Sequence, residues 1–202
     1  MILETERLIL REMTQEDLPA LKEILQDEET MYAYNGAFDE EETRAWLNRQ
    51  LTRYAQDGFG LWAVVLRETG RMIGQCGLTM QPWRGDSVLE VGSLFNRAFW
   101  HSGYATEAAR GCMDYAFTRL DAREVCSIIR ETNLPSRRVA ERNGMTVRDT
   151  WVKHYRGIDM PHVRYCAVRE YAKTGKPPKV MRPSEAFSIH PASPGQSAHS
   201  GR

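Results

Sequence analysis

The chain has 202 residues and equal numbers of basic and acidic side chains, 27 of each, so its formal net charge is zero. It therefore lacks the basic field that attracts nucleic acid, while 42% hydrophobic residues suffice for a folded core. No apolar run approaches the ~18 residues of a membrane span, and the charged N-terminus MILETERLIL does not read as a signal peptide. We expect a soluble cytoplasmic protein that binds neither nucleic acid nor membrane.

The cysteines are too scattered to form a recognisable metal motif. The chain has four, and none stands in a CxxC or Cys–His spacing typical of zinc sites: Cys76, Cys112, Cys126 and Cys166. We interpret them as reduced, buried, small hydrophobic residues. The sequence spacing predicts no metal site.

The first quarter of the chain predicts a strand and two helices. Leu8 and Leu10 alternate with other residues in RLILREM, the period-two pattern of a strand. Leucines at helical spacing follow Thr14, a candidate N-cap, and predict the first helix. Asp39 as N-cap and Gly58 as terminator predict the second helix. The aromatic segment MYAYNGAF between the helices predicts a loop.

The middle of the chain predicts an antiparallel block of strands and then a helix. LWAVVLR and MIGQCGLTM flank the short turn ETGR and predict a hairpin. A third strand is expected over residues 87–95, and apolar residues at helical spacing predict a helix over residues 106–120.

The last third predicts a strand EVCSIIRE, a short helix and two closing strands. The strand EVCSIIRE follows a helix, which favours parallel pairing with residues 87–95 through a crossover. Asn133 is a candidate N-cap for a helix ending at Gly144. The closing strands are TVRDTWVKHY and HVRYCAVRE, joined by RGIDMP. This order predicts one mixed α/β domain over residues 1–172, followed by a flexible Pro/Ser/Gly-rich tail over residues 173–202.

The junction FWHSGYATEA, residues 99–108, brings a glycine to the start of a helix. The first N–H groups of a helix lack intrahelical acceptors and lie at the positive end of its dipole, so they can hold a phosphate. A plain turn explains the same residues, and the local sequence leaves both interpretations open. No Walker motif and no Gly-x-Gly-x-x-Gly occurs, which disfavours ATP and dinucleotide folds.

Four segments, in this order, resemble the GNAT superfamily of N-acetyltransferases, in particular the branch of ribosomal-protein N-terminal acetyltransferases. They are LETERLILREMTQEDLPAL, LEVGSLFNRAFWHSGYATEAARG, ETNLPSRRVAERNGM and YRGIDMPHVRYCAVRE, and the match spans about residues 3–170. The resemblance implies a single domain with a mostly antiparallel mixed sheet, a splayed parallel strand pair and flanking helices.

The resemblance also implies acetyl-CoA as cosubstrate. The pyrophosphate would lie on backbone amides of the loop and helix start: His101, Ser102, Gly103, Tyr104, Ala105 and Thr106. The pantetheine arm would pair with the backbone of Leu94 and Phe95, and Asn133 would bond the pantetheine or the acetyl region. Arg138, in a cluster with Arg137 and Arg142, would meet the 3′-phosphate or simply solvate a helix face. Two loop positions depart from the family pattern, because His101 stands where glycine is common and Ser102 where a basic residue or Gln is common.

Amine acetylation needs a group that accepts the amine proton and a partner for the leaving thiolate. We favour Glu90 as the base, with a solvated or ion-paired carboxylate as the alternative. We favour Ser136 as the thiolate partner, with helix capping as the alternative. Glu107 is interpreted as compensation of the helix dipole. An N–H near Leu94 is the candidate donor to the developing oxyanion.

We therefore predict an N-acetyltransferase that moves an acetyl group from acetyl-CoA to a primary amine, with a protein N-terminal α-amine favoured. Direct attack in a ternary complex is expected, because no cysteine reads as an acyl acceptor. The alternatives are acetylation of a polyamine, amino acid or antibiotic, and a non-catalytic acyl-CoA sensor. Either a monomer or a homodimer fits. Candidates for the acceptor pocket, with core packing or a strand surface as the alternative, are Tyr32, Tyr34, Trp46, Trp83, His154, Tyr155 and His162.

Overall fold

The computed structural model describes residues 1–169, which fold around one eight-stranded sheet. The strands are β1 Leu3–Glu4, β2 Leu8–Arg11, β3 Leu61–Leu66, β4 Met72–Trp83, β5 Asp86–Phe95, β6 Glu124–Arg130, β7 Thr146–Tyr155 and β8 Ile158–Val168. The α-helices are α1 Leu18–Leu25, α2 Glu40–Asp57, α3 Tyr104–Arg119 and α4 Leu134–Arg142. The order in the sheet is β1-β2-β3-β4-β5-β6-β8-β7, and only β5 and β6 run parallel.

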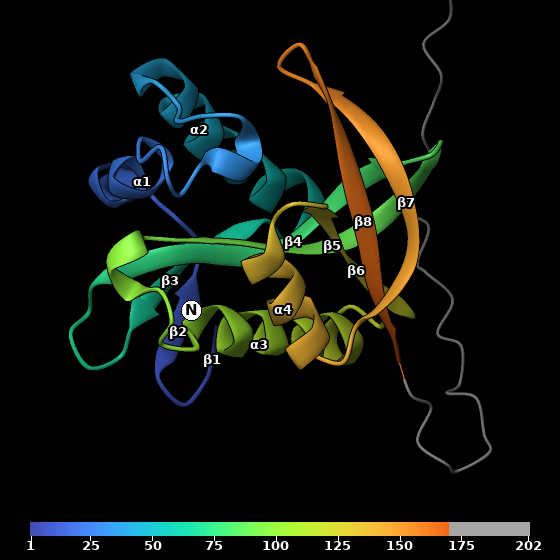
Figure 1. The fold of residues 1–202 in the computed structure, drawn as a ribbon. Helices are drawn as coiled ribbons and strands as arrows, with labels where there is room; N and C mark the ends of the chain where they lie inside the picture. Colours follow the sequence, from blue (N-terminus) through green and yellow to red (C-terminus); the bar gives the residue numbers. More distant parts are fainter. Residues whose placement is uncertain (170–202) are drawn as a thin grey trace, which may run out of the picture. The chain divides into compact units, whose positions relative to one another are not determined.

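The sheet is the middle layer of the fold. In Figure 1, α1 and α2 lie over one face, and α3 and α4 lie over the other. Each face has its own buried apolar cluster. Leu21 and Leu47 represent the cluster under α1 and α2, and Cys112 and Ala140 represent the cluster under α3 and α4. This is the mixed α/β single-domain architecture that the sequence predicted.

Local sequence signals explain why the elements begin and end where they do. Leu8 and Leu10 are completely buried, as their alternation predicted. The Asp39 carboxylate accepts the N–H of Glu42 at the start of α2, and Gly58 ends the helix with φ +76°. The Asn133 side chain likewise caps α4 by accepting the N–H of Ser136. These capping predictions are confirmed.

The structure differs from the sequence prediction in detail. The two-residue strand β1 was missed because it is too short to show alternation. Most of RGIDMP belongs to β8, so the predicted loop shrinks to a turn at Arg156 and Gly157. Helix α3 begins at Tyr104, two residues before the predicted Thr106. The predicted boundary at residue 172 and the predicted tail lie outside the described residues. Within residues 1–169, no helix combines the length and apolarity needed to cross a membrane.

Candidate functional site

The two parallel strands separate at Glu90. The ladder between β5 and β6 has a single registered pair, Glu90 with Cys126. Val91 belongs to the apolar cluster on the α3 face, whereas Leu94 packs against the cluster on the α1–α2 face. Because side chains alternate along a strand, Glu90 lies on the α1–α2 face. The predicted splay of the parallel pair therefore begins beside an ionisable side chain.

Beyond Glu90, β5 presents backbone groups that β6 does not pair. The Ser127 hydroxyl donates to the Val91 carbonyl at 3.0 Å, and the Trp100 indole donates to the Phe95 carbonyl at 2.9 Å. These two bonds flank the residues between them, Gly92 to Leu94, which pair only with β4. An extended ligand backbone can add to such an open strand edge. One acceptor position of the predicted Phe95 site is already taken by Trp100.

The loop after β5 leads directly into the first turn of α3. Gly103, the N-cap residue, has φ +83°, and His101 has φ +62°, so the loop contains two left-handed residues. Among residues 1–169, the N–H groups of Tyr104, Ala105 and Thr106 have no hydrogen-bond acceptor. Unpaired amides at a helix start favour an anion. The loop therefore suits a phosphate, as the predicted cradle requires.

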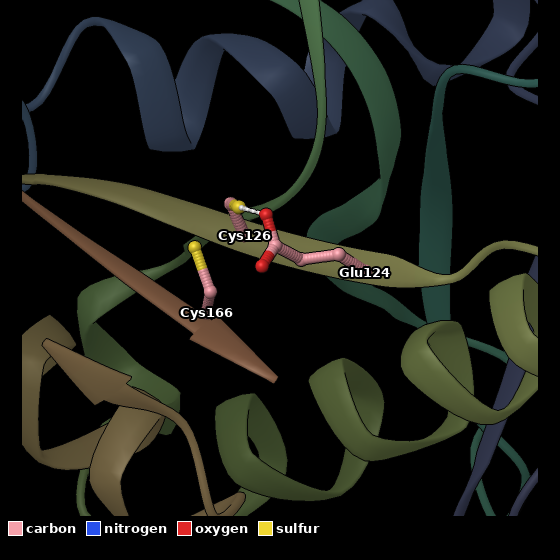
Figure 2. A group of neighbouring side chains, drawn as sticks. All are labelled: Glu124, Cys126 and Cys166. Carbon is pink, nitrogen blue, oxygen red and sulfur yellow. Dashed lines mark hydrogen bonds between the residues drawn. The ribbon is translucent and has the colours of Figure 1, made fainter. Parts of the chain in front are cut away.

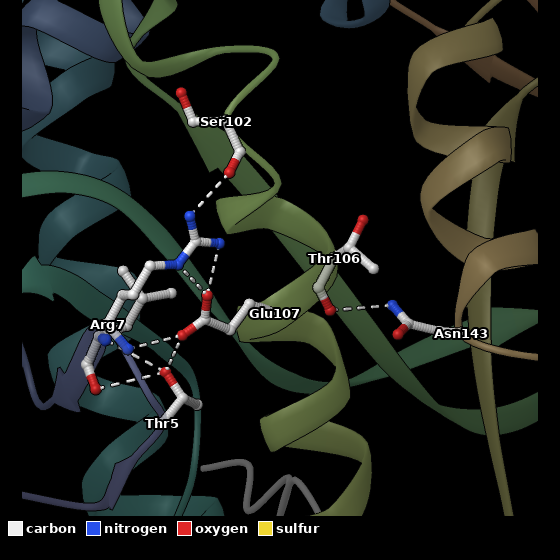
Figure 3. A network of polar contacts seen from close by, with 7 residues as sticks. Thr5, Arg7, Ser102, Thr106, Glu107 and Asn143 are labelled. Atoms are coloured by element: carbon white, nitrogen blue, oxygen red, sulfur yellow. Dashed lines mark hydrogen bonds and ion pairs between the residues drawn. The ribbon is translucent and has the colours of Figure 1, made fainter.

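Arg7, near the N-terminus, contacts this loop and the first turn of α3. Its guanidinium donates to the Ser102 carbonyl at 3.0 Å, pairs with Glu107 at 2.7 Å and stacks 4.5 Å from the centre of the Tyr104 ring. Thr5 donates to the same carboxylate at 2.6 Å, as Figure 3 shows. Sequence reasoning missed Arg7, because nothing local connects it to the loop.

Glu107 is thereby confirmed as a structural residue at the start of α3. Burial would raise the pKa of its carboxyl, but the hydrogen bonds from Thr5 and Arg7 outweigh burial and hold the pKa below its usual value. On the other side of the helix, the Asn143 amide donates to the Thr106 carbonyl at 3.2 Å (Figure 3). The first turn of α3 is thus held from the connection between β1 and β2 and from the end of α4.

Glu90 is partly buried on the α1–α2 face of the sheet. Its carboxylate accepts the N–H of Ile128 at 3.1 Å, so it bridges the two separating strands. The side chain keeps some solvent-accessible surface, yet burial raises the pKa of its carboxyl to about 7. The Ile128 N–H and the charges of Lys153 and Arg53 act in the opposite direction without cancelling burial. Burial therefore favours the neutral form of this carboxyl more than solvent would.

Other ionisable side chains around Glu90 share this environment. Burial lowers the pKa of Lys153 and of Arg53 and raises that of Tyr34, and the charge of Glu90 acts on all three. No described residue forms an ion pair with Lys153, whose Nζ lies 5.6 Å from the centre of the Trp83 ring. Sequence reasoning missed Lys153 and Arg53, since a single charge on a strand or helix carries no signal of what it faces.

The aromatic candidates divide into side chains buried in the core and side chains that are more exposed. Trp46 and Trp83 are buried, at 8% and 1% exposure, so for them the core-packing alternative holds. Tyr32 and Tyr155 are both 39% exposed. Tyr34 contacts Trp46 edge to face at 5.8 Å, and the charge of Glu90 acts on its hydroxyl.

The two candidate histidines have different surroundings. His154 is exposed and lies 2.9 Å from Asp159, as expected for a strand surface. His162 is half-buried, and burial lowers the pKa of its imidazole. It lines a hollow of about 390 Å³ together with Arg84, Glu131, Thr150, Trp151, Val152, Pro161 and Val163.

The start of α4 carries the remaining predicted residues. Because Asn133 caps the helix through its Oδ1, at 3.2 Å from the Ser136 N–H, the Ser136 hydroxyl is not the cap. Within residues 1–169 that hydroxyl makes no hydrogen bond. Arg137 is occupied by Tyr165 at 3.0 Å and by the Glu131 carbonyl. Arg138 is exposed, and no described residue pairs with it.

Two contacts between residues distant in sequence join the sheet to α2 and to the segment before it. Arg156, at the β7–β8 turn, forms an ion pair with Glu42 of α2 and stacks 5.1 Å from the centre of the Phe38 ring. Arg130, at the end of β6, donates to the Tyr32 carbonyl at 2.8 Å. These contacts attach the closing hairpin to the start of α2 and attach β6 to the segment before α2.

Comparison with known proteins identifies the family of the chain. The acetyltransferase (GNAT) domain family model matches residues 7–146. The uncharacterized protein YkkB of Bacillus subtilis is 38% identical over 142 residues, which are 70% of this chain and 83% of the relative. The FsC-acetyl coenzyme A-N(2)-transacetylase of Aspergillus fumigatus is 32% identical over 154 residues, covering 69% of this chain and 63% of the relative.

The fold itself is also found among solved structures. An acetyltransferase from Agrobacterium tumefaciens is 30% identical, with a TM-score of 0.70 over 83% of this chain and 94% of that chain. It shares the overall fold of this chain. This chain therefore belongs to the acetyltransferase (GNAT) family and is an N-acetyltransferase by that membership.

Proposed function

We propose that this enzyme transfers the acetyl group of acetyl-CoA to a primary amine, with the α-amine of a peptide or protein N-terminus as the favoured acceptor. The observation that carries the proposal is Glu90, an ionisable carboxyl at the point where β5 leaves β6. Its side chain lies on the face of the sheet that α1 and α2 cover, next to the β5 residues Gly92 to Leu94, which pair only with β4.

The residues present fit acetyl-CoA. The unpaired N–H groups of Tyr104, Ala105 and Thr106, with the backbone of His101, Ser102 and Gly103, suit its pyrophosphate. The open edge of β5 near Leu94 and Phe95 suits the amide groups of its pantetheine arm. Asn133 has its side-chain NH₂ left for the same arm, and Arg138 suits the 3′-phosphate. When bound, acetyl-CoA supplies the thioester that is cleaved.

Each chain residue has a defined task in a direct transfer. Glu90 takes the proton that the amine loses, directly or through a water, while the new N–C bond forms and the C–S bond breaks. An N–H near Leu94 donates to the developing charge on the carbonyl oxygen. Ser136 gives a proton or hydrogen bond to the leaving thiolate. No covalent acyl-enzyme is needed, and every cysteine is at most 4% exposed.

The pKa of Glu90 favours an α-amine over a lysine-type amine. An α-amine has a pKa of about 7.7–8.0 and a lysine amine about 10.4. Since the pKa of Glu90 is about 7, taking a proton from a lysine-type ammonium is uphill by about 3 pKa units, or roughly 4–5 kcal/mol. The corresponding cost for an α-amine is about 1 kcal/mol.

A small-molecule amine is the second candidate acceptor. The Aspergillus fumigatus relative is named for acetyl coenzyme A and an N(2) acceptor position, which supports a small acceptor in this family. An acceptor panel separates the two: peptides with free and blocked N-termini, single amino acids, a polyamine and Nα-blocked lysine. CoA release, with product mass, should be fastest for free α-amines. Tight CoA binding without release for any acceptor would overturn the proposal in favour of a sensor.

Glu90→Gln tests the assigned base. We expect kcat to fall on the order of 100-fold at pH 8, the usual size of general-base catalysis. The wild-type kcat should decline as the pH falls below about 7, because the carboxylate is protonated there. The variant should lack this limb, and Glu40→Gln, on exposed α2, is the control. An unchanged pH–kcat profile in Glu90→Gln removes Glu90 from the role.

A further inference from the structure

Two cysteines that lie 40 positions apart in the sequence face each other across β6 and β8, where Cys126 is registered with Cys166. Backbone bonds from Arg169 to Arg123 and from Glu131 to Pro161 show that the odd residues of β6 are the hydrogen-bonded positions toward β8. Cys126 and Cys166 therefore form a non-hydrogen-bonded pair, the arrangement in which opposite side chains lie closest. Both are buried, with 1% and 4% exposure.

A carboxylate completes the cluster. Glu124 precedes Cys126 by two residues on β6, so both side chains lie on the same face of the sheet. The Cys126 thiol donates to Glu124 Oε1 at 3.5 Å, and one donor atom from each of the three residues lies within 4.8 Å of the others. Figure 2 shows the two sulfur atoms and the carboxylate turned toward one another.

These distances are close to those around a bound zinc ion. With Zn–S near 2.3 Å and Zn–O near 2.1 Å, tetrahedral geometry places donor atoms about 3.6–3.8 Å apart. The thiol–carboxylate separation of 3.5 Å already matches. The remaining separations need to close by about 1 Å at most, which side-chain rotation supplies.

The charges around the cluster also suit a divalent ion. Metal binding removes the protons from both thiols, so the three ligands together carry three negative charges. A divalent cation leaves one negative charge, and Arg148, paired with the outer oxygen of Glu124, neutralises it. Arg148 also holds the carboxylate so that Oε1 stays aimed at Cys126. An outer partner of this kind orients a metal ligand.

We propose that Glu124, Cys126 and Cys166 bind one thiophilic divalent cation of the Zn²⁺ type. Two thiolates and one carboxylate from the protein leave a fourth position for water. The Glu124 side chain is 30% exposed, which gives the ion a path and that water a place. The site ties β6 to β8 at Cys126, the position of β6 that is registered with Glu90. Its role is structural, and it stands independently of the proposed acetyl transfer.

The experiment uses the full chain, freed of metal by a chelator and kept reduced with a phosphine. Titration with Co²⁺ should give thiolate-to-cobalt charge-transfer absorption that saturates at one ion per chain, and Zn²⁺ should displace it and raise the Tm. Cys126→Ser and Cys166→Ser should each abolish the absorption. Glu124→Gln, half-exposed and similar in size, should weaken binding by about tenfold or more while the chain stays folded.

The matched control is the second buried thiol pair, Cys76 and Cys112, whose sulfurs lie 3.6 Å apart between β4 and α3. No described carboxylate accompanies that pair. The double variant Cys76→Ser/Cys112→Ser should keep the cobalt spectrum and the stoichiometry. Absence of charge-transfer absorption in the wild type overturns the proposal. So does absorption that survives loss of Cys126 and Cys166, or a Glu124→Gln variant that binds as tightly as the wild type.

Discussion

At the scale of single residues, the proposed proton transfer depends on the charges that surround Glu90. Burial raises the pKa of its carboxyl, whereas Lys153 lowers it. Lys153→Met removes that positive charge, so the pKa of Glu90 should rise further. The acidic limb of the pH–kcat profile should then move to higher pH, and activity at pH 7 should fall.

The conservative change Lys153→Arg is the control, because it keeps the charge and the contact with the Trp83 ring. Its acidic limb should stay near that of the wild type. A limb that does not move in Lys153→Met would mean that Lys153 is too far from the Glu90 carboxyl to influence it.

Gly103 has a left-handed backbone in the loop before α3, where we propose that the pyrophosphate of acetyl-CoA binds. Its φ of +83° strains any L side chain, and a Cβ there would lie 3.5 Å from the Arg7 guanidinium. Gly103→Val should therefore raise the KM for acetyl-CoA by about tenfold or more, because the side chain blocks close approach to the amides. Binding can be measured directly by calorimetry with CoA.

The matched control is Gly58→Val at the end of α2. Gly58 has φ +76° with nothing near its Cβ position, so its substitution introduces a similar backbone strain, about 1–2 kcal/mol, away from the loop. It should lower the Tm and leave acetyl-CoA affinity intact. If both variants bind acetyl-CoA as the wild type does, the loop does not hold the pyrophosphate.

At the scale of elements, Glu107 attaches the start of α3 to the connection between β1 and β2. The folded-state pKa of Glu107 lies below its ordinary value near 4.5. Its contribution to stability is therefore present above that value and is lost as the pH falls through the folded-state pKa. Glu107→Gln should lower the free energy of unfolding by about 1–2 kcal/mol at pH 7, and the deficit should shrink in acid.

Urea denaturation at pH 7 and at pH 4 or lower measures this difference. Glu41→Gln provides the control, because Glu41 is an exposed acid in the first turn of α2 and tests the helix dipole alone. A deficit in Glu107→Gln that is equally large at both pH values would contradict the assignment to the ionised carboxylate.

Elements could be predicted where their signal is local. Asp39 and Asn133 mark helix starts through bonds to residues within a few positions. Gly58 marks a helix end by its positive φ, and alternation marks β2. The two-residue β1 and the start of β8 in RGIDMP carry no such pattern. Their pairing with β2 and β7 decides them, and pairing depends on tertiary contacts.

At the scale of the whole molecule, the β7–β8 turn is held against the start of α2. Arg156 supplies that contact through Glu42 and Phe38. Arg156→Ala should raise the KM for the acceptor several-fold. Without this contact the β7–β8 hairpin is more mobile, and ordering it when the acceptor binds costs free energy. The KM for acetyl-CoA should stay unchanged. Equal changes in both constants would show that the hairpin does not act on the acceptor side alone.

The site was predictable only as far as the four recognisable segments extend. They indicated Glu90, the loop from His101 and the α4 start, whose roles stay predictions until tested. Arg7, Lys153 and the pairing of Cys126 with Cys166 escaped prediction. Each acquires its importance from a residue that is distant in sequence: Glu107 on α3 for Arg7, Glu90 on β5 for Lys153, and the facing strand for the two cysteines. A single sequence does not show which distant residues meet.

The bond between Arg7 and Glu107 joins residues 100 positions apart. Closing so long a loop carries an entropic cost that must be offset by other contacts formed first. The N-terminal strand pair should therefore dock late in folding, after the local hairpins β3–β4 and β4–β5 have formed. During synthesis, α3 should therefore emerge before Arg7 can bind Glu107 and before the loop that precedes α3 reaches its final conformation.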